Sequence, residues 1–85
     1  MTYKIEIKKS VFKTLRQLNR QTLDKVKKSI DKLAHDPRPF GYKKLVDEEG
    51  LYRIRVGNYR IIYEIHGQIL LIVVLRVAKR NEDTY

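Results

Sequence analysis

The chain has 85 residues, of which 19 are Lys or Arg and 10 are Asp or Glu, so its formal net charge is +9 at pH 7. A chain of this length has room for one domain, residues 1–85, and buries about 60–65% of its unfolded surface in a thin core. The chain has no cysteine, which excludes disulfides and cysteine zinc sites and suits a reducing cytoplasm. It has two histidines, which are too few to form a metal site.

The large positive charge restricts the possible functions. Such a field commonly serves to bind a polyanion or an acidic protein, whereas the simpler interpretation is solubility alone. The longest apolar run, residues 69–75, is far shorter than the roughly 20 residues of a membrane span. No signal-peptide apolar stretch follows residues 1–4, so we expect a cytoplasmic protein without a membrane segment.

The first elements are a strand and a short helix. Apolar and charged residues alternate over residues 3–8, which predicts a half-buried strand. Apolar residues then recur at helical spacing, which predicts a helix over residues 10–18 with Ser10 as its N-cap.

A second, longer helix follows a polar break at residues 19–22. Its apolar residues repeat at three- and four-residue steps from Leu23 onward, and lysines fill the other face. The helix should end near His35, because Asp36 precedes a proline and such a residue is pushed out of the α region. The short break predicts an antiparallel helix hairpin.

The rest of the chain has the pattern of a sheet. Residues 37–50 are turn-rich, with a possible short edge strand at 42–46. Two alternating runs follow, separated by Gly57-Asn58, a pair typical of a β-hairpin turn. Residues 69–77 form a nearly unbroken apolar run, expected to be a central strand covered on both faces.

This order of elements predicts an α+β fold of two layers. It comprises an N-terminal strand, an antiparallel helix hairpin and then a three- to four-stranded antiparallel sheet, with the helices covering one sheet face. The other face is therefore the place to look for function.

Three arginines are expected to share that other face. If Gly57-Asn58 forms a two-residue loop, Arg55 lies opposite Arg60, and Arg53 lies on the same side. Like charges directly across a ladder destabilise a sheet by a few tenths to about 1 kcal/mol. A bound phosphate would reverse that effect, because guanidinium groups bind phosphate oxygens bidentately. The alternative is a solvated surface on which Glu64 forms a salt bridge with Arg53.

The C-terminal segment adds further candidates. Arg76 and Arg80 lie on the same face as Arg53, Arg55 and Arg60 if a three-residue loop through Gln68 connects the last two strands, which we expect. A two-residue loop does not align them unless a β-bulge intervenes. Tyr85 is either part of a frayed end or a functional residue. In the second case its ring stacks on an unpaired base, or its phenol transfers protons.

Several common chemistries are missing from the sequence. There is no Gly-rich phosphate loop and no convincing Ser-His-Asp triad. A paired-carboxylate metal nuclease is disfavoured, because the candidate sheet face is rich in arginine and Glu64 is its only expected carboxylate. His35 and His66 are interpreted as surface residues, and neither a metal nor a cofactor is expected.

The string YRIRVGNYRIIYEI at residues 52–65, followed by LRVAKR at 75–80 and by Tyr85, resembles the RelE group of the RelE/ParE toxin superfamily. The resemblance spans the whole chain. It implies a RelE-like toxin of a bacterial or archaeal type II toxin-antitoxin pair, neutralised by a RelB-like antitoxin. It further implies that the protein cuts mRNA in the ribosomal A site without metal, by attack of a ribose 2′-hydroxyl on the adjacent phosphate.

Residue by residue, the resemblance implies a catalytic set, and four further basic residues are expected to bind RNA. The catalytic set is Arg53, Arg55, Arg60, Arg80 and Tyr85. The RNA-binding set is Lys43, Lys44, Arg76 and Lys79. Arginine, with a pKa above about 12, cannot serve as the general base, whereas cations near Tyr85 would lower the pKa of its phenol. Lys79 stands where many relatives have histidine, which removes one proton carrier.

Two other functional classes remain open at the level of the sequence. A ParE-like toxin shares the fold but inhibits DNA gyrase and lacks the nuclease residues. A non-catalytic RNA- or ribosome-binding protein would dock through the basic face alone, with an affinity that falls steeply as salt rises.

Overall fold

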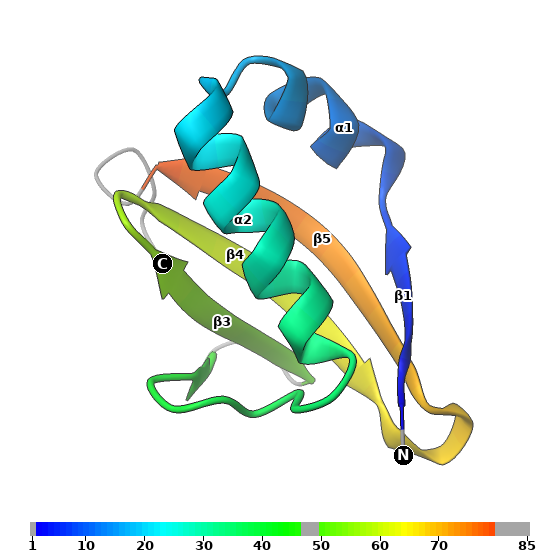
Figure 1. The fold of residues 1–85 in the computed structure, drawn as a ribbon. Helices are drawn as coiled ribbons and strands as arrows, with labels where there is room; N and C mark the ends of the chain where they lie inside the picture. The colour runs from blue at the N-terminus through cyan, green and yellow to red at the C-terminus, as the bar shows by residue number, and fades with distance from the viewer. Residues whose placement is uncertain (1, 47–49, 80–85) are drawn as a thin grey trace.

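The computed structural model describes residues 2–46 and 50–79. In chain order the elements are β1 (Lys4–Ile7), α1 (Lys9–Arg16), α2 (Arg20–Leu33), β2 (Lys43–Lys44), β3 (Leu51–Val56), β4 (Tyr59–His66), η1 (Gly67–Ile69) and β5 (Leu71–Lys79). The five strands form one sheet in the order β1-β5-β4-β3-β2, and both helices lie on one face of it (Figure 1). The predicted two-layer α+β fold is confirmed.

The strand count exceeds the prediction, because the N-terminal strand joins the sheet. β1 pairs in parallel with β5, whereas the three other pairings are antiparallel. The backbone N–H of Tyr3 donates to the carbonyl of Ala34 at 2.7 Å, which ties the start of β1 to the end of α2. Neither helix in the described ranges is long and apolar enough to cross a membrane.

The start of each helix differs from the prediction. Asn19 caps α2, because its Oδ1 accepts from the backbone N–H of Thr22 at 2.8 Å. The predicted break at residues 19–22 is therefore mostly the first turn of α2. Ser10, the predicted cap of α1, lies inside the helix, whose N-cap is Lys8 without a side-chain hydrogen bond. The predicted end of α2 near His35 agrees with the observed end at Leu33.

The core lies between the helices and one sheet face. Its buried members from the helices and strands are Val11, Leu15, Val26, Ile30, Leu33, Ile54, Ile61, Tyr63, Ile72, Val74 and Val77. The β3–β4 hairpin has the predicted register, with Val56 opposite Tyr59, so its alternating apolar residues face the helices. Burial raises the pKa of the Tyr63 phenol, and its hydroxyl donates to the carbonyl of Pro37 at 2.7 Å.

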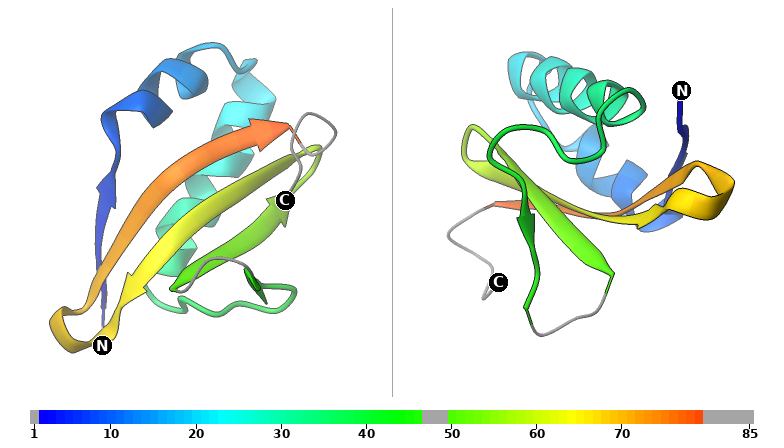
Figure 2. Two further views of the ribbon diagram at one scale, coloured as in Figure 1. Left: turned by 180° about the vertical axis from the view of Figure 1, so that it is seen from behind. Right: turned by 90° about the horizontal axis from the view of Figure 1, so that it is seen from below.

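The connection between β4 and β5 is longer than predicted. It spans residues 67–70 and includes η1 and Leu70, whose φ of 53° is left-handed. β5 lies inside the sheet, as predicted, but the helices cover only one of its faces (Figure 2). Val73 and Leu75, on the other face, are half-buried, so the prediction of burial on both faces is wrong.

Candidate nucleic-acid interface

The sheet face turned away from the helices carries four arginines, which we call the arginine face: Arg53, Arg55, Arg60 and Arg76. The left panel of Figure 2 looks directly onto this face, and no helix lies in front of it. Arg55 lies directly opposite Arg60 across the β3–β4 ladder, as predicted. Arg53 and Arg76 both lie opposite Ile62, one from each neighbouring strand. Three adjacent strands thus contribute guanidinium groups to one surface.

A β-bulge places Arg76 on this face. Tyr63 pairs with Val74 and Ile62 pairs with Arg76, so Leu75 has no partner in the register. Without the bulge, Arg76 would lie opposite Ile61, whose side chain faces the helices. The predicted alignment of Arg76 is therefore correct, although a bulge and a longer loop produce it.

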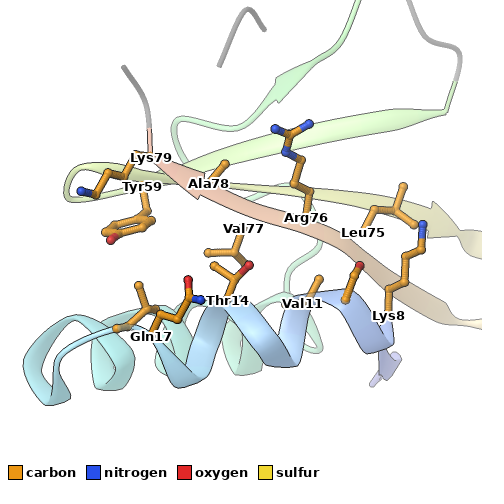
Figure 3. A pocket seen from close by; sticks show the side chains of 12 residues that line it. Lys8, Val11, Thr14, Gln17, Tyr59, Leu75, Arg76, Val77, Ala78 and Lys79 are labelled. Carbon is orange, nitrogen blue, oxygen red and sulfur yellow. The ribbon is translucent and has the colours of Figure 1, made fainter. Parts of the chain in front are cut away.

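Figure 3, a close-up of the groove between α1 and β5, shows side chains of the sheet that point to opposite sides of it. The side chain of Arg76 points away from α1, while the side chains of Val77 and Tyr59 point toward it. This groove has a volume of about 670 Å³. Arg76 thus lies on the arginine face, although it also lines this groove.

The four arginines differ in exposure, a difference that alternation along the strands does not predict. Arg53 and Arg60 are only 7% and 6% exposed, whereas Arg55 and Arg76 are exposed. A packed side chain has few accessible rotamers, so its guanidinium group is held in place before any ligand arrives.

Glu64, which the sequence offered as a salt-bridge partner of Arg53, forms a contact with His66. The Oε1 atom of Glu64 lies 3.0 Å from Nε2 of His66.

Two hollows border the arginine face. One, of about 720 Å³, is lined by Arg55, Arg60 and Lys79 together with Asn19, Thr22, Asn58 and Tyr59. The other, of about 390 Å³, is lined by Arg53, Arg55 and Lys43 together with Ser29, Lys32, Pro39, Phe40, Gly41 and Ile54. Arg55 lines both hollows.

The expected RNA-binding lysines are distributed around this surface. Lys43 pairs with Arg53 and so lies on the same side of the sheet. Lys44 pairs with Tyr52, on the side of the helices. Lys79 is opposite Tyr59, also on that side, yet it reaches the hollow that contains Arg60. Arg80 and Tyr85, the remaining expected catalytic residues, lie outside the described residues.

A column of aromatic rings supports the loop beside the second hollow, and sequence reasoning did not identify it. The Tyr52 ring lies 6.1 Å from that of Tyr42 and 6.0 Å from that of Tyr63, centroid to centroid. The guanidinium carbon of Arg38 lies 5.4 Å from the centroid of Tyr52. A hydrogen bond with the Tyr52 hydroxyl raises the pKa of Arg38. The sequence signal that could have revealed this column is the presence of Tyr52 and Tyr63 in the two strands of the predicted hairpin.

Known proteins share both the sequence and the fold. Residues 5–84 match the family of ParE toxins of type II toxin-antitoxin systems (ParDE). A curated relative from Methanocaldococcus jannaschii, the putative toxin RelE1, is 31% identical over 84 residues, which cover 95% of this chain and 93% of the relative.

Solved structures agree with the sequence matches. A chain of the archaeal RelE-RelB complex from Pyrococcus horikoshii OT3 has a TM-score of 0.85 and 32% identity, over 98% of this chain and 100% of that chain. A chain of the RelB-RelE complex from Methanococcus jannaschii has a TM-score of 0.71 and 27% identity, over 91% and 92%. An E. coli RelE variant has the same fold, with a TM-score of 0.81 at 22% identity over 98% and 88%. This chain therefore belongs to the RelE group of the RelE/ParE superfamily of toxin-antitoxin toxins.

Proposed function

We propose that this protein is the toxin of a RelBE-type pair and that it cleaves mRNA in the ribosomal A site without a metal ion. The observation that carries the proposal is the direct pairing of Arg55 with Arg60 on the open sheet face. Two like charges at this spacing destabilise the hairpin, and a phosphate between them reverses the sign of the interaction. The Arg55–Arg60 pair is therefore suited to bind a phosphodiester.

The proposed reaction is an internal transfer of the phosphoryl group. The ribose 2′-oxygen forms a bond to the adjacent phosphorus while the bond from phosphorus to the 5′-oxygen breaks. The 2′-hydroxyl loses a proton and the 5′-oxygen gains one, so the products carry a 2′,3′-cyclic phosphate and a 5′-hydroxyl. Negative charge grows on the phosphate oxygens, and preorganised guanidinium groups stabilise it by several kcal/mol.

Each basic residue receives a role in this proposal. Arg53, Arg55, Arg60 and Arg80 bind and stabilise the reacting phosphate, while Lys43, Lys44, Arg76 and Lys79 hold the flanking RNA. Tyr85 is proposed as the proton-transfer group, because arginine does not deprotonate at neutral pH. Hard metal ions prefer oxygen ligands, and a surface built from guanidinium groups repels them, which supports a reaction without metal.

The partners follow from family membership and charge. The Pyrococcus horikoshii relative is a RelE-RelB complex, so we propose a RelB-like antitoxin for this chain. The net charge of +9 favours association with an acidic antitoxin and with ribosomal RNA. The ribosome would supply the ordered mRNA strand on which the toxin acts.

The chemistry of the cut ends tests this proposal. A message translated on ribosomes in the presence of the toxin should give fragments with 2′,3′-cyclic phosphate and 5′-hydroxyl ends. A parallel supercoiling assay with DNA gyrase should show no trapped cleaved DNA. Fragments with 3′-hydroxyl ends, or cleaved DNA in the gyrase assay, would overturn the proposal.

The metal requirement needs a separate experiment, because ribosomes themselves depend on Mg²⁺. Ribosomes stalled on a message are transferred into buffer in which cobalt(III) hexammine replaces Mg²⁺, and the toxin is then added for one round of cleavage. The ligands of this cobalt ion do not exchange, so it supplies charge without coordinating a phosphate oxygen directly. Cleavage should persist at a similar rate, and its loss on intact ribosomes would contradict a reaction without metal.

A further inference from the structure

Phe40 has no place in the core and none in the proposed chemistry. Its side chain is 107% exposed, the highest value among the large hydrophobic residues in the described ranges. The loop that carries it is nevertheless well anchored. The Tyr63 hydroxyl donates to the carbonyl of Pro37 at 2.7 Å, and the N–H of Arg38 donates to Oδ1 of Asp36 at 3.2 Å. The exposure of Phe40 is thus a property of an anchored loop.

A tight turn directs the ring outward. The N–H of Tyr42 donates to the carbonyl of Pro39 at 3.0 Å, which closes a four-residue turn with Phe40 at its second position. Gly41, at the third position, has a φ of +89°, the left-handed conformation that a type II turn requires there. At the corner of this turn the Phe40 side chain lies in solvent.

The same turn borders the hollow of about 390 Å³ beside β3. Phe40 shares its lining with four basic side chains, Lys32, Lys43, Arg53 and Arg55. β2 pairs only with Tyr52 and Arg53 of β3. The hollow lies along the part of β3 that continues beyond this pairing, at Ile54 and Arg55. An aromatic ring is thereby placed beside a cluster of cations.

We propose that Phe40 is a stacking platform for a base of single-stranded RNA next to the cleaved phosphate. The inference rests on the proposed function, because it takes RNA as the substrate. Base stacking on an aromatic ring combined with a cationic groove for the backbone is the usual architecture of single-strand binding. Arg55 lines both hollows, so one RNA strand can pass from the Arg55–Arg60 pair to the Phe40 ring. A protein segment would instead demand a broader apolar surface than one ring among four cations.

The sequence contains no tryptophan, so Phe40→Trp introduces a single fluorescent probe at the site. Ile69→Trp is the matched control, because Ile69 is also exposed, at 69%, and lies in η1 at the β4–β5 turn. Each variant is titrated with a short RNA in which every sugar carries a 2′-O-methyl group, so that attack by the 2′-oxygen is blocked. The titration is repeated on the same strand annealed into a duplex.

Stacking should quench the fluorescence of the Phe40→Trp variant with the single strand and leave that of the Ile69→Trp variant unchanged. Phe40→Ala should bind the single strand about 5- to 150-fold more weakly, while Phe40→Tyr keeps its affinity, because a stacked base contributes about 1–3 kcal/mol. Three results would overturn the inference: equal quenching in the two tryptophan variants, quenching in neither, or stronger quenching of the Phe40→Trp variant by the duplex than by the single strand. Quenching without any cleavage of translated message would contradict the nuclease proposal and leave the stacking site intact.

Discussion

Arg55 and Arg60 lie directly opposite one another across the β3–β4 ladder, yet Arg60 is 6% exposed and Arg55 is exposed. In the proposed function, the packed guanidinium group of Arg60 would supply a positioned charge, and the exposed guanidinium group of Arg55 would adjust to the phosphate. Such a pair opposes the stability of the hairpin and favours the binding of an anion. Stability and activity are therefore expected to respond in opposite directions when the pair is broken.

Arg55→Gln should raise the free energy of unfolding by a few tenths to about 1 kcal/mol, because it removes the repulsion across the ladder. It should also slow cleavage about ten- to a hundredfold, since a charge-assisted hydrogen bond contributes about 1.5–3 kcal/mol. Urea denaturation and cleavage assays measure the two effects. Lys25→Gln, on the exposed side of α2, is the control and should change neither by much. A loss of stability in Arg55→Gln would argue against a repulsive pair.

Arg60→Ala and Arg80→Ala should each abolish growth arrest in cells that express the toxin without its antitoxin, because each removes a charge assigned to the reacting phosphate. Circular dichroism of the purified variants should show a folded protein. Colony counts after induction measure the effect. Undiminished arrest in a folded Arg60→Ala variant would remove this residue from the proposed site.

Asn19→Ala should destabilise the protein by about 0.5–2 kcal/mol, because it removes the side-chain acceptor for the Thr22 N–H at the start of α2. Ser10→Ala is the matched comparison, since Ser10 lies inside α1 and does not cap it. Thermal unfolding of both variants provides the test. Equal losses of stability would mean that the capping hydrogen bond contributes nothing specific.

Tyr63→Phe should cost about 0.5–1.5 kcal/mol at neutral pH, because it removes the hydrogen bond to Pro37. The buried phenol has a raised pKa, so the folded protein keeps this proton above pH 10 while the unfolded chain, with a tyrosine pKa of about 10, releases it. Wild-type stability therefore falls above pH 10 through this group. The difference between wild type and Tyr63→Phe should shrink between pH 8 and pH 11, as followed by urea denaturation, and a constant difference would contradict the assignment.

The hairpin and the open face could be predicted from the sequence because both depend on local rules. Gly57-Asn58 specifies a two-residue turn, and the turn determines which side chains lie opposite one another. Once Arg55 is placed opposite Arg60, strict alternation along the strand decides the face of Arg53 as well. The family resemblance involves the same residues.

The features that were missed depend on tertiary contacts. The four-residue connection at 67–70 and the bulge at Leu75 together set the register of Arg76, and the residue types at neither place signal it. The burial of Arg53 and Arg60 depends on what packs over the sheet, which alternation along a strand does not encode. Asn19 is a recognisable N-cap, but the polar residues after it suggest a loop.

Guanidinium groups on the open sheet face are proposed to act on mRNA held by the ribosome. The most direct measurement is primer extension on a translated message, with and without ribosomes, for wild type, Arg60→Lys and the control Lys25→Ala. Lysine keeps the charge of Arg60 but loses its planar fork. We expect ribosome-dependent breaks at A-site codons for wild type and Lys25→Ala, and breaks weakened at least about tenfold for a folded Arg60→Lys. Breaks of wild-type intensity in Arg60→Lys, or no breaks with wild type, would show that the arginine face does not cleave mRNA in this way.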